Sequence, residues 1–234
     1  MPKRNAEYVG VIWKLFPMAL LALILSTGCA SYAMRLAPIP RSGSMPARVI
    51  DQGVEVGADP YLESERQRNV FNEDLKKWRV LPIQLFVKNF EERRRWVRYA
   101  DITLEFHEEK HVGPVTADTV VAAVAGKIPG FRPGPGAAPP VPGAGIAMLM
   151  ILGAEAGMYQ AEVEAWVARL KDYRSKEFPD VVLGKNDAAS GFVFFNIPPD
   201  LALGEATLLL RLIEAEDGSH LSIRLRLKEL HLKE

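Results

Sequence analysis

The sequence predicts an α+β fold, an antiparallel β-sandwich that carries a helical insertion rich in glycine and proline. Near both ends of the body, apolar and polar residues alternate with the two-residue period of half-buried strands. Between these regions, from about residue 112 to 180, the pattern becomes helical and a Gly/Pro run interrupts it. Three predicted strands precede the insertion and three follow it. Three consecutive strands do not easily close a core, so we expect both groups to join in one sandwich.

The first 28 residues have the three-part plan of a secretory signal peptide. Positive charges at Lys3, Arg4 and Lys14 precede an apolar stretch at 15–25, which is too short to span a bilayer as a helix. Small residues at 26–28 then lead to Cys29, the only cysteine of the chain. The pattern predicts export from the cytoplasm.

The small residues just before Cys29 resemble the lipobox of bacterial lipoproteins. The resemblance implies that Cys29 is lipid-modified and that the signal is removed before it. Ser26 stands where the family usually has leucine. An enteric retention signal for the inner membrane has aspartate after the cysteine, whereas this chain has Ala30, which implies the outer membrane, facing the periplasm.

Two alternatives to lipidation follow from the same region. The tripeptide Ser31-Tyr32-Ala33 would suit an ordinary signal peptidase, which would release a soluble secreted protein. Residues 9–25 would otherwise remain as an uncleaved anchor. We expect lipidation, because the lone cysteine lies at the one position where this modification would use it.

The charge balance argues against nucleic acid as a partner. The whole chain has 29 basic and 29 acidic residues, and the signal removes three bases and one acid, which leaves 26 against 28, a net charge of −2. Nucleic-acid-binding proteins carry a clear basic excess. No cysteine pair remains after Cys29, so the core must be stabilised by burial alone.

The segment after the cysteine is predicted to be a lipidated tether, residues 29–47, because it is rich in Pro, Ser and Gly. Its 17 residues from Ala30 to Pro46 would span at most roughly 55–60 Å. A β-sandwich domain is expected over 48–234. It begins with a strand at 49–58 and a helix at 64–78, where Ser64 and Gln67 would form a capping box and Trp78 would share the buried face.

Strands are predicted at 81–88 and 96–106, and the charged turn between them predicts a hairpin. Arg93, Arg94, Arg95 and Arg98 cluster there. They would meet lipid phosphates or lipopolysaccharide. In the simpler interpretation they lie at a solvated hairpin tip flanked by Glu91 and Glu92.

The segment His107-Glu108-Glu109-Lys110-His111 matches the His-Glu-x-x-His signature of zinc peptidases. A zinc-dependent hydrolase using His107, Glu108 and His111 is therefore the alternative function. The mechanism needs a helix, so that both imidazoles lie on one face, but a strand precedes this segment and Gly113-Pro114 follows it. We therefore expect no metal site and no cofactor.

Within the insertion, a helix is predicted at 116–125, then the Gly/Pro run, then an apolar stretch at 144–154 that leads into an amphipathic helix ending at 176. The apolar stretch would either be buried in its own domain or protrude toward a partner or membrane. Its candidate contact residues are Ile146, Met148, Leu149, Gly153 and Gly157, of which the two glycines would let a second helix pack closely.

The last 55 residues contain the clearest strands. Phe192–Phe195 is a dense apolar run that suits a strand buried on both faces. Residues 207–213 and 221–227 form a predicted hairpin around Asp217-Gly218. In its second arm Ser222, Arg224 and Arg226 alternate with apolar residues, which predicts that they face water. The segment from Ser190 to Phe195 resembles a strand of immunoglobulin-like envelope domains, which implies an immunoglobulin-like sandwich.

Neither a Ser/His/Asp set, nor a paired acid cleft, nor a phosphate loop is evident in the sequence. We therefore expect a non-enzymatic lipoprotein of the cell envelope. It would attach to the membrane through Cys29 and bind an envelope protein, or itself, through its exposed sheet or its apolar helix.

Overall fold

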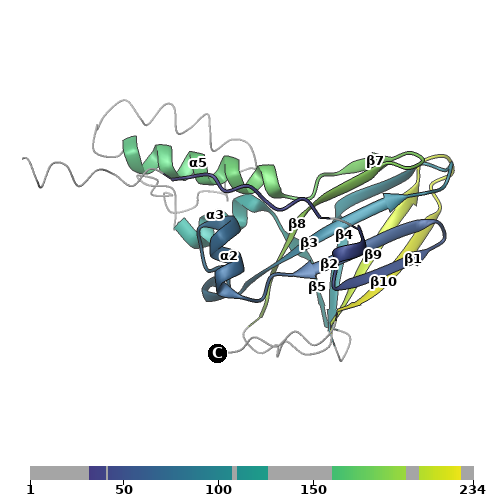
Figure 1. Ribbon diagram of the computed structural model, residues 1–234, viewed down its shortest axis with the longest axis horizontal. Helices are drawn as coiled ribbons and strands as arrows, with labels where there is room; N and C mark the ends of the chain where they lie inside the picture. Colours follow the sequence, from purple (N-terminus) through teal and green to yellow (C-terminus); the bar gives the residue numbers. More distant parts are fainter. Residues whose placement is uncertain (1–31, 41, 107–109, 126–159, 199–205, 228–234) are drawn as a thin grey trace, which may run out of the picture. The chain divides into compact units, whose positions relative to one another are not determined.

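Two antiparallel sheets pack face to face, and helices cover the outer side of one of them (Figure 1). The computed structural model describes residues 32–40, 42–106, 110–125, 160–198 and 206–227. Sheet A has the order β1-β2-β3-β8-β6, and sheet B has the order β10-β9-β4-β5, with β7 paired to β4. The predicted α+β sandwich is confirmed.

The strands of sheet A are β1 (Ala47–Asp51), β2 (Val54–Pro60), β3 (Val80–Asn89), β8 (Ala188–Asn196) and β6 (Pro114–Val115). Those of sheet B are β10 (His220–Leu227), β9 (Ala206–Glu214), β4 (Arg95–Phe106), β5 (Lys110–Val112) and β7 (Val181–Leu183). The two predicted groups of strands do combine, since β3 pairs with β8 and β4 pairs with β9.

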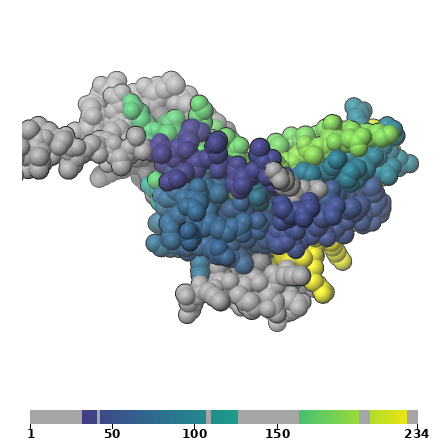
Figure 2. Space-filling model, viewed as in Figure 1, coloured from purple at the N-terminus to yellow at the C-terminus, as the bar shows by residue number. Residues whose placement is uncertain are grey.

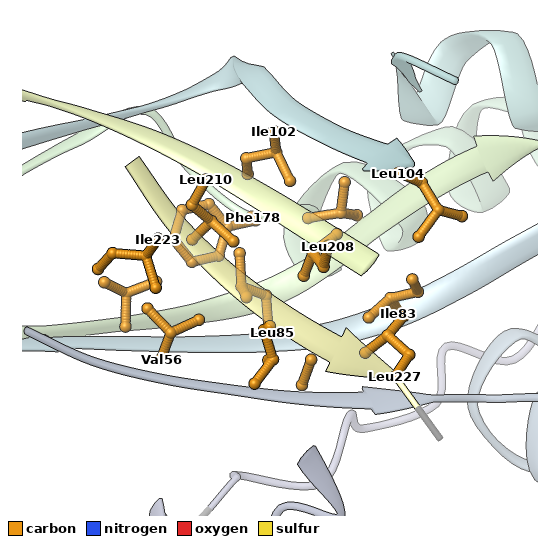
Figure 3. Close-up of a cluster of buried hydrophobic side chains, with 14 of the residues drawn as sticks. Val56, Ile83, Leu85, Ile102, Leu104, Phe178, Leu208, Leu210, Ile223 and Leu227 are labelled. Carbon is orange, nitrogen blue, oxygen red and sulfur yellow. The ribbon is translucent and has the colours of Figure 1, made fainter. Parts of the chain in front are cut away.

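The main core lies between the two sheets and consists mainly of aliphatic side chains that alternate along the strands, with a few phenylalanines such as Phe178 (Figure 3). Leu85 of β3, Leu104 of β4, Leu210 of β9 and Ile223 of β10 are fully buried. Full burial of one such side chain contributes about 1.5–3 kcal/mol.

A second core lies between sheet A and the helices. Phe192 and Phe194 of β8 belong to this second core, whereas Val193 and Phe195 of the same strand belong to the first. The predicted burial of this strand on both faces is thereby confirmed, because side chains on a strand point alternately to opposite sides.

The helical layer contains α2 (Ser64–Phe71), η2 (Leu75–Trp78), α3 (Ala117–Ala125) and α5 (Gln160–Lys176). The predicted apolar face of α5 packs as expected, with Trp166, Leu170 and Tyr173 buried in the second core. The prediction of one helix from 64 to 78 was wrong. The chain turns at Asn72, which has a left-handed conformation with φ of 58°, and continues as η2.

Two details of that helix also differ from the prediction. Trp78 is 46% exposed rather than buried. Gln67 forms no capping box; its amide donates to the Tyr61 carbonyl at 2.5 Å and accepts from the Lys76 N–H at 2.9 Å. Gln67 therefore joins α2 to η2, a contact that depends on the turn at Asn72.

The predicted strand 49–58 is in fact a hairpin of β1 and β2. Asp51 pairs with Val54, so the loop contains only Gln52 and Gly53, and both have positive φ (44° and 70°). Two-residue hairpin loops favour such angles because their twist matches that of the strands.

The predicted hairpin between 81–88 and 96–106 was also wrong, because β3 and β4 belong to different sheets. Asn89 is completely buried, and its side-chain amide donates to the carbonyls of Arg93 at 2.8 Å and Leu183 at 3.1 Å. These bonds hold the chain where it crosses from sheet A to sheet B. By contrast, the predicted hairpin around Asp217-Gly218 is confirmed as β9 and β10.

The part of the predicted tether that the structure describes lies against the body. We call residues 33–40 the strap. The Asn72 amide donates to the Ala33 carbonyl at 2.6 Å, and the buried Gln84 amide donates to the Pro38 carbonyl at 2.6 Å. The strap therefore differs from a freely extended chain over this length.

Candidate functional site

The outer side of sheet B presents several exposed side chains, although Leu209 on this side is buried. In Figure 1 the helices gather beside sheet A, and none of those described lies over sheet B. We call this outer side the open face. Its residues lie on neighbouring strands at alternate positions: Ser222, Arg224 and Arg226 of β10, Thr207, Leu209, Arg211 and Ile213 of β9, and Trp96, Thr103 and Glu105 of β4.

Three arginines dominate the charge of the open face. Arg211, Arg224 and Arg226 are all exposed, and the register places Arg211 opposite Ser222 and Arg224 opposite Leu209. Glu105 lies near them and contacts Arg224 at 3.8 Å and His111 at 3.4 Å. The described part of this face therefore has a positive charge excess, although the chain as a whole has none.

An apolar row lies next to the arginines. Ile213 is paired with Trp96, and Trp96 is paired with Val182 of β7. Trp96 is 41% exposed and Val182 is 45% exposed. The Arg98 guanidinium lies 5.6 Å from the centre of the Trp96 ring. Aromatic, aliphatic and cationic groups therefore share one surface.

A bulge in β4 shapes the edge of this surface. Val97 pairs with Leu212 and Ile102 with Leu210, so residues 98–101 lie opposite the single residue Arg211. Such bulges bend a strand and redirect its side chains.

The bulge turns Tyr99 toward sheet A. The Tyr99 hydroxyl donates to the Val115 carbonyl at 2.7 Å and accepts from the Phe194 N–H at 3.1 Å. Burial raises the pKa of Tyr99 above its ordinary value. Tyr99 therefore stays neutral at neutral pH and joins the two sheets.

The predicted arginine cluster at 93–98 is largely occupied by ion pairs. Arg93 and Arg95 both bind the carboxylate of Glu214, at 2.8 and 2.5 Å. Arg94 binds Glu216 at 3.1 Å, and Arg98 binds Asp101 at 2.5 Å. The partners of these arginines are therefore not the neighbouring Glu91 and Glu92, and Arg95 is buried on β4 rather than solvated.

The structure places His111 on a strand. It lies on β5 opposite Glu105 of β4, and its side chain is 55% exposed. The zinc-peptidase mechanism requires a helix at this position. His107 and Glu108 lie outside the described residues, and within those that are described no group of three His, Cys, Asp or Glu is placed to hold a metal ion.

The other predicted site residues lie outside the part of the chain that the structure describes. They are the lipidation site Cys29 and the contact residues Ile146, Met148, Leu149, Gly153 and Gly157. Of the helices that are described, none combines the length and apolar character that crossing a membrane requires.

Sequence reasoning identified the solvent-facing alternation of Ser222, Arg224 and Arg226 but did not identify Arg211 as their neighbour. The sequence feature that could have indicated Arg211 is the presence of this one arginine within the apolar run of β9. Only the register of β9 with β10 shows that these arginines share a face.

Comparisons with known proteins leave the family open. No protein-family model and no curated protein matches the chain. Among solved structures, a candidate lipoprotein (ycdA) from Bacillus subtilis subsp. subtilis str. 168 has a TM-score of 0.38 and 10% identity, over 77% of this chain and 38% of that one. A functionally unknown protein from Listeria monocytogenes EGD-e has a TM-score of 0.33 and 9% identity, over 77% of this chain and 80% of that one. The chain thus spans well under half the length of the Bacillus protein, and likeness at these scores establishes neither fold nor function.

Proposed function

We propose that the protein is a non-catalytic lipoprotein of the cell envelope that binds an acidic partner protein through its open face. The observation that carries this proposal is that Arg211, Arg224 and Arg226 are exposed together on two paired strands. Glu105 is an acidic residue close to them and contacts Arg224. An acidic surface would complement this charge and accelerate association.

The residue types on the open face favour a protein as the partner. Aromatic residues and arginine are enriched at protein–protein interfaces and account for much of their binding energy. Trp96 and Ile213 supply a flat apolar area beside Arg211. The net charge of −2 expected for the chain after signal removal argues against a nucleic acid.

The location rests on the export signal and on Cys29, which is expected to be acylated. One acyl chain holds a protein only marginally, whereas two or more give stable attachment. Ala30, in place of the aspartate of the enteric retention signal, favours the outer membrane and the periplasmic side. A zinc hydrolase is disfavoured, because His111 lies on a strand rather than on a helix.

The experiment uses the full chain in its native membranes, with a photo-crosslinking amino acid at the exposed Ser222, which lies on the edge strand β10 opposite Arg211. We expect one adduct of defined mass, which Arg211→Glu combined with Arg224→Glu should remove. The matched charge reversal, Lys77→Glu with Lys171→Glu, changes two exposed cations of the helical layer and should leave the adduct unchanged.

A crosslinker at the exposed Asn69 of α2 is the positional control. An equal adduct from Asn69, or an adduct that persists in the arginine variant, would contradict the binding face. An adduct with a second copy of the chain would show that the open face mediates self-association instead of binding a different, acidic protein. Cys29→Ser should release the protein from the membrane, and sedimentation of this variant after a salt wash would contradict the anchor.

A further inference from the structure

The strap is attached to the body at several points. The Arg35 Nε donates to the Asn72 side-chain oxygen at 2.8 Å, and the Asn72 amide donates back to the Ala33 carbonyl at 2.6 Å. Ala37 packs against the second core, and the Pro38 carbonyl accepts from Gln84. In Figure 2 the purple N-terminal part of the described chain lies on the molecular surface beside the blue residues of the helical layer.

Three apolar side chains of the strap face away from the body. Met34 is 53% exposed, Leu36 is 96% exposed and Ile39 is 90% exposed. The strap thus uses Arg35, Ala37 and backbone carbonyls to hold the body, while its large apolar side chains remain in contact with solvent. Large apolar groups that gather on one exposed segment indicate a contact with something outside the domain.

The distance along the chain to Cys29 indicates what covers these side chains. Met34 is five residues and Leu36 seven residues after Cys29. An extended chain spans at most about 17 Å over five residues and about 25 Å over seven. The polar region of each leaflet is roughly 5–8 Å thick, so Leu36 is within reach of the lipid if Cys29 is acylated.

We propose that the strap lies on the membrane surface, with Met34, Leu36 and Ile39 inserted at the lipid interface, and holds the body close to the bilayer. This inference rests on the proposed anchoring through Cys29. The body is thus mounted directly on the membrane rather than carried on a long flexible tether.

The test uses the full, acylated chain in vesicles of phosphatidylethanolamine and phosphatidylglycerol that contain a nitroxide-labelled lipid as quencher. Acylation blocks the thiol of Cys29, the only cysteine, so a second cysteine can be labelled specifically with a fluorophore. The variants Leu36→Cys and Ile39→Cys report on the strap. Ile50→Cys and Val182→Cys, at exposed aliphatic residues of β1 and β7, are the matched controls.

We expect the lipid quencher to reduce fluorescence several-fold more at positions 36 and 39 than at positions 50 and 182. Equal quenching at all four positions would overturn the inference. A blue-shifted emission at 36 and 39 without lipid quenching would assign the strap to a second copy of the chain and would overturn it as well.

The two proposals fail in different ways. If Cys29 is not acylated, the protein will not sediment with the vesicles, and the proposed anchor is wrong. If the protein sediments but positions 36 and 39 are not quenched, the anchor stands and the membrane contact of the strap is wrong.

Discussion

Tyr99→Phe tests whether the bulge of β4 joins the two sheets. The substitution removes one oxygen atom and keeps the ring, so it leaves no large cavity. It takes a hydrogen-bond acceptor from the Phe194 N–H and a donor from the Val115 carbonyl. A polar group in the interior that loses its partner costs about 1–3 kcal/mol. Both of these bonds are partly buried, so we take about 1–2 kcal/mol for each group and expect a total loss of about 2–4 kcal/mol.

Urea denaturation measures this loss as a shift of the midpoint. With a slope of about 2–3 kcal/mol per molar, a loss of 3 kcal/mol lowers the midpoint by about 1–1.5 M. The matched control is Tyr61→Phe, which removes a hydroxyl that donates to the Gln84 side chain over a longer distance of 3.3 Å. This distance is beyond the usual range of about 2.5–3.0 Å for an O–H···O hydrogen bond, so the bond is weak although Gln84 is buried, and we expect a loss of about 1 kcal/mol for the control.

A loss in Tyr99→Phe that does not exceed the loss in Tyr61→Phe would refute the reasoning. It would mean that water or another group satisfies the two backbone atoms once the hydroxyl is gone. An unchanged slope is also expected, because the substitution alters the stability and not the surface exposed on unfolding.

Two further predictions concern the C-terminal end of α5. The Lys176 ammonium is buried and donates to Asp172 and to the Val70 carbonyl, both at 2.6 Å. In urea denaturation Lys176→Met should therefore lower the free energy of unfolding by about 3–5 kcal/mol, and adding Asp172→Leu should recover most of this loss. A loss below about 1 kcal/mol in Lys176→Met would contradict the role of the pair. The Glu177 carboxylate accepts from the Ala117 N–H at 2.7 Å, and burial raises the pKa of Glu177 above its ordinary value. The contribution of Glu177 to stability is therefore present below its pKa in the unfolded chain and is lost as pH rises through its pKa in the folded protein. The free energy of unfolding of the wild type minus that of Glu177→Gln should therefore decrease as pH rises from the ordinary Glu pKa toward neutral, and a difference that increases with pH would contradict this sign.

Local patterns in the sequence determined the type of most elements and the faces of several. Phe192–Phe195 could be assigned to two cores because four successive apolar residues on a strand require apolar contacts on both sides. The alternation of β10 and the Asp217-Gly218 turn predicted the last hairpin correctly, because a short connection and a two-residue period depend only on neighbouring residues.

Only the tertiary structure decided which strands are neighbours and which surfaces remain open. Nothing local to the turn at 89–95 shows that β3 and β4 separate, because the separation depends on the buried amide of Asn89 and on the pairing of β3 with β8 about a hundred residues later. Arg211 joins Arg224 and Arg226 only through the register of β9 with β10. The sequence of the strap predicts a tether. Its attachment to the body depends on two distant side chains, Asn72 and Gln84, which donate hydrogen bonds to backbone carbonyls of the strap. Backbone carbonyls are present at every residue, so a sequence cannot indicate which of them find a partner.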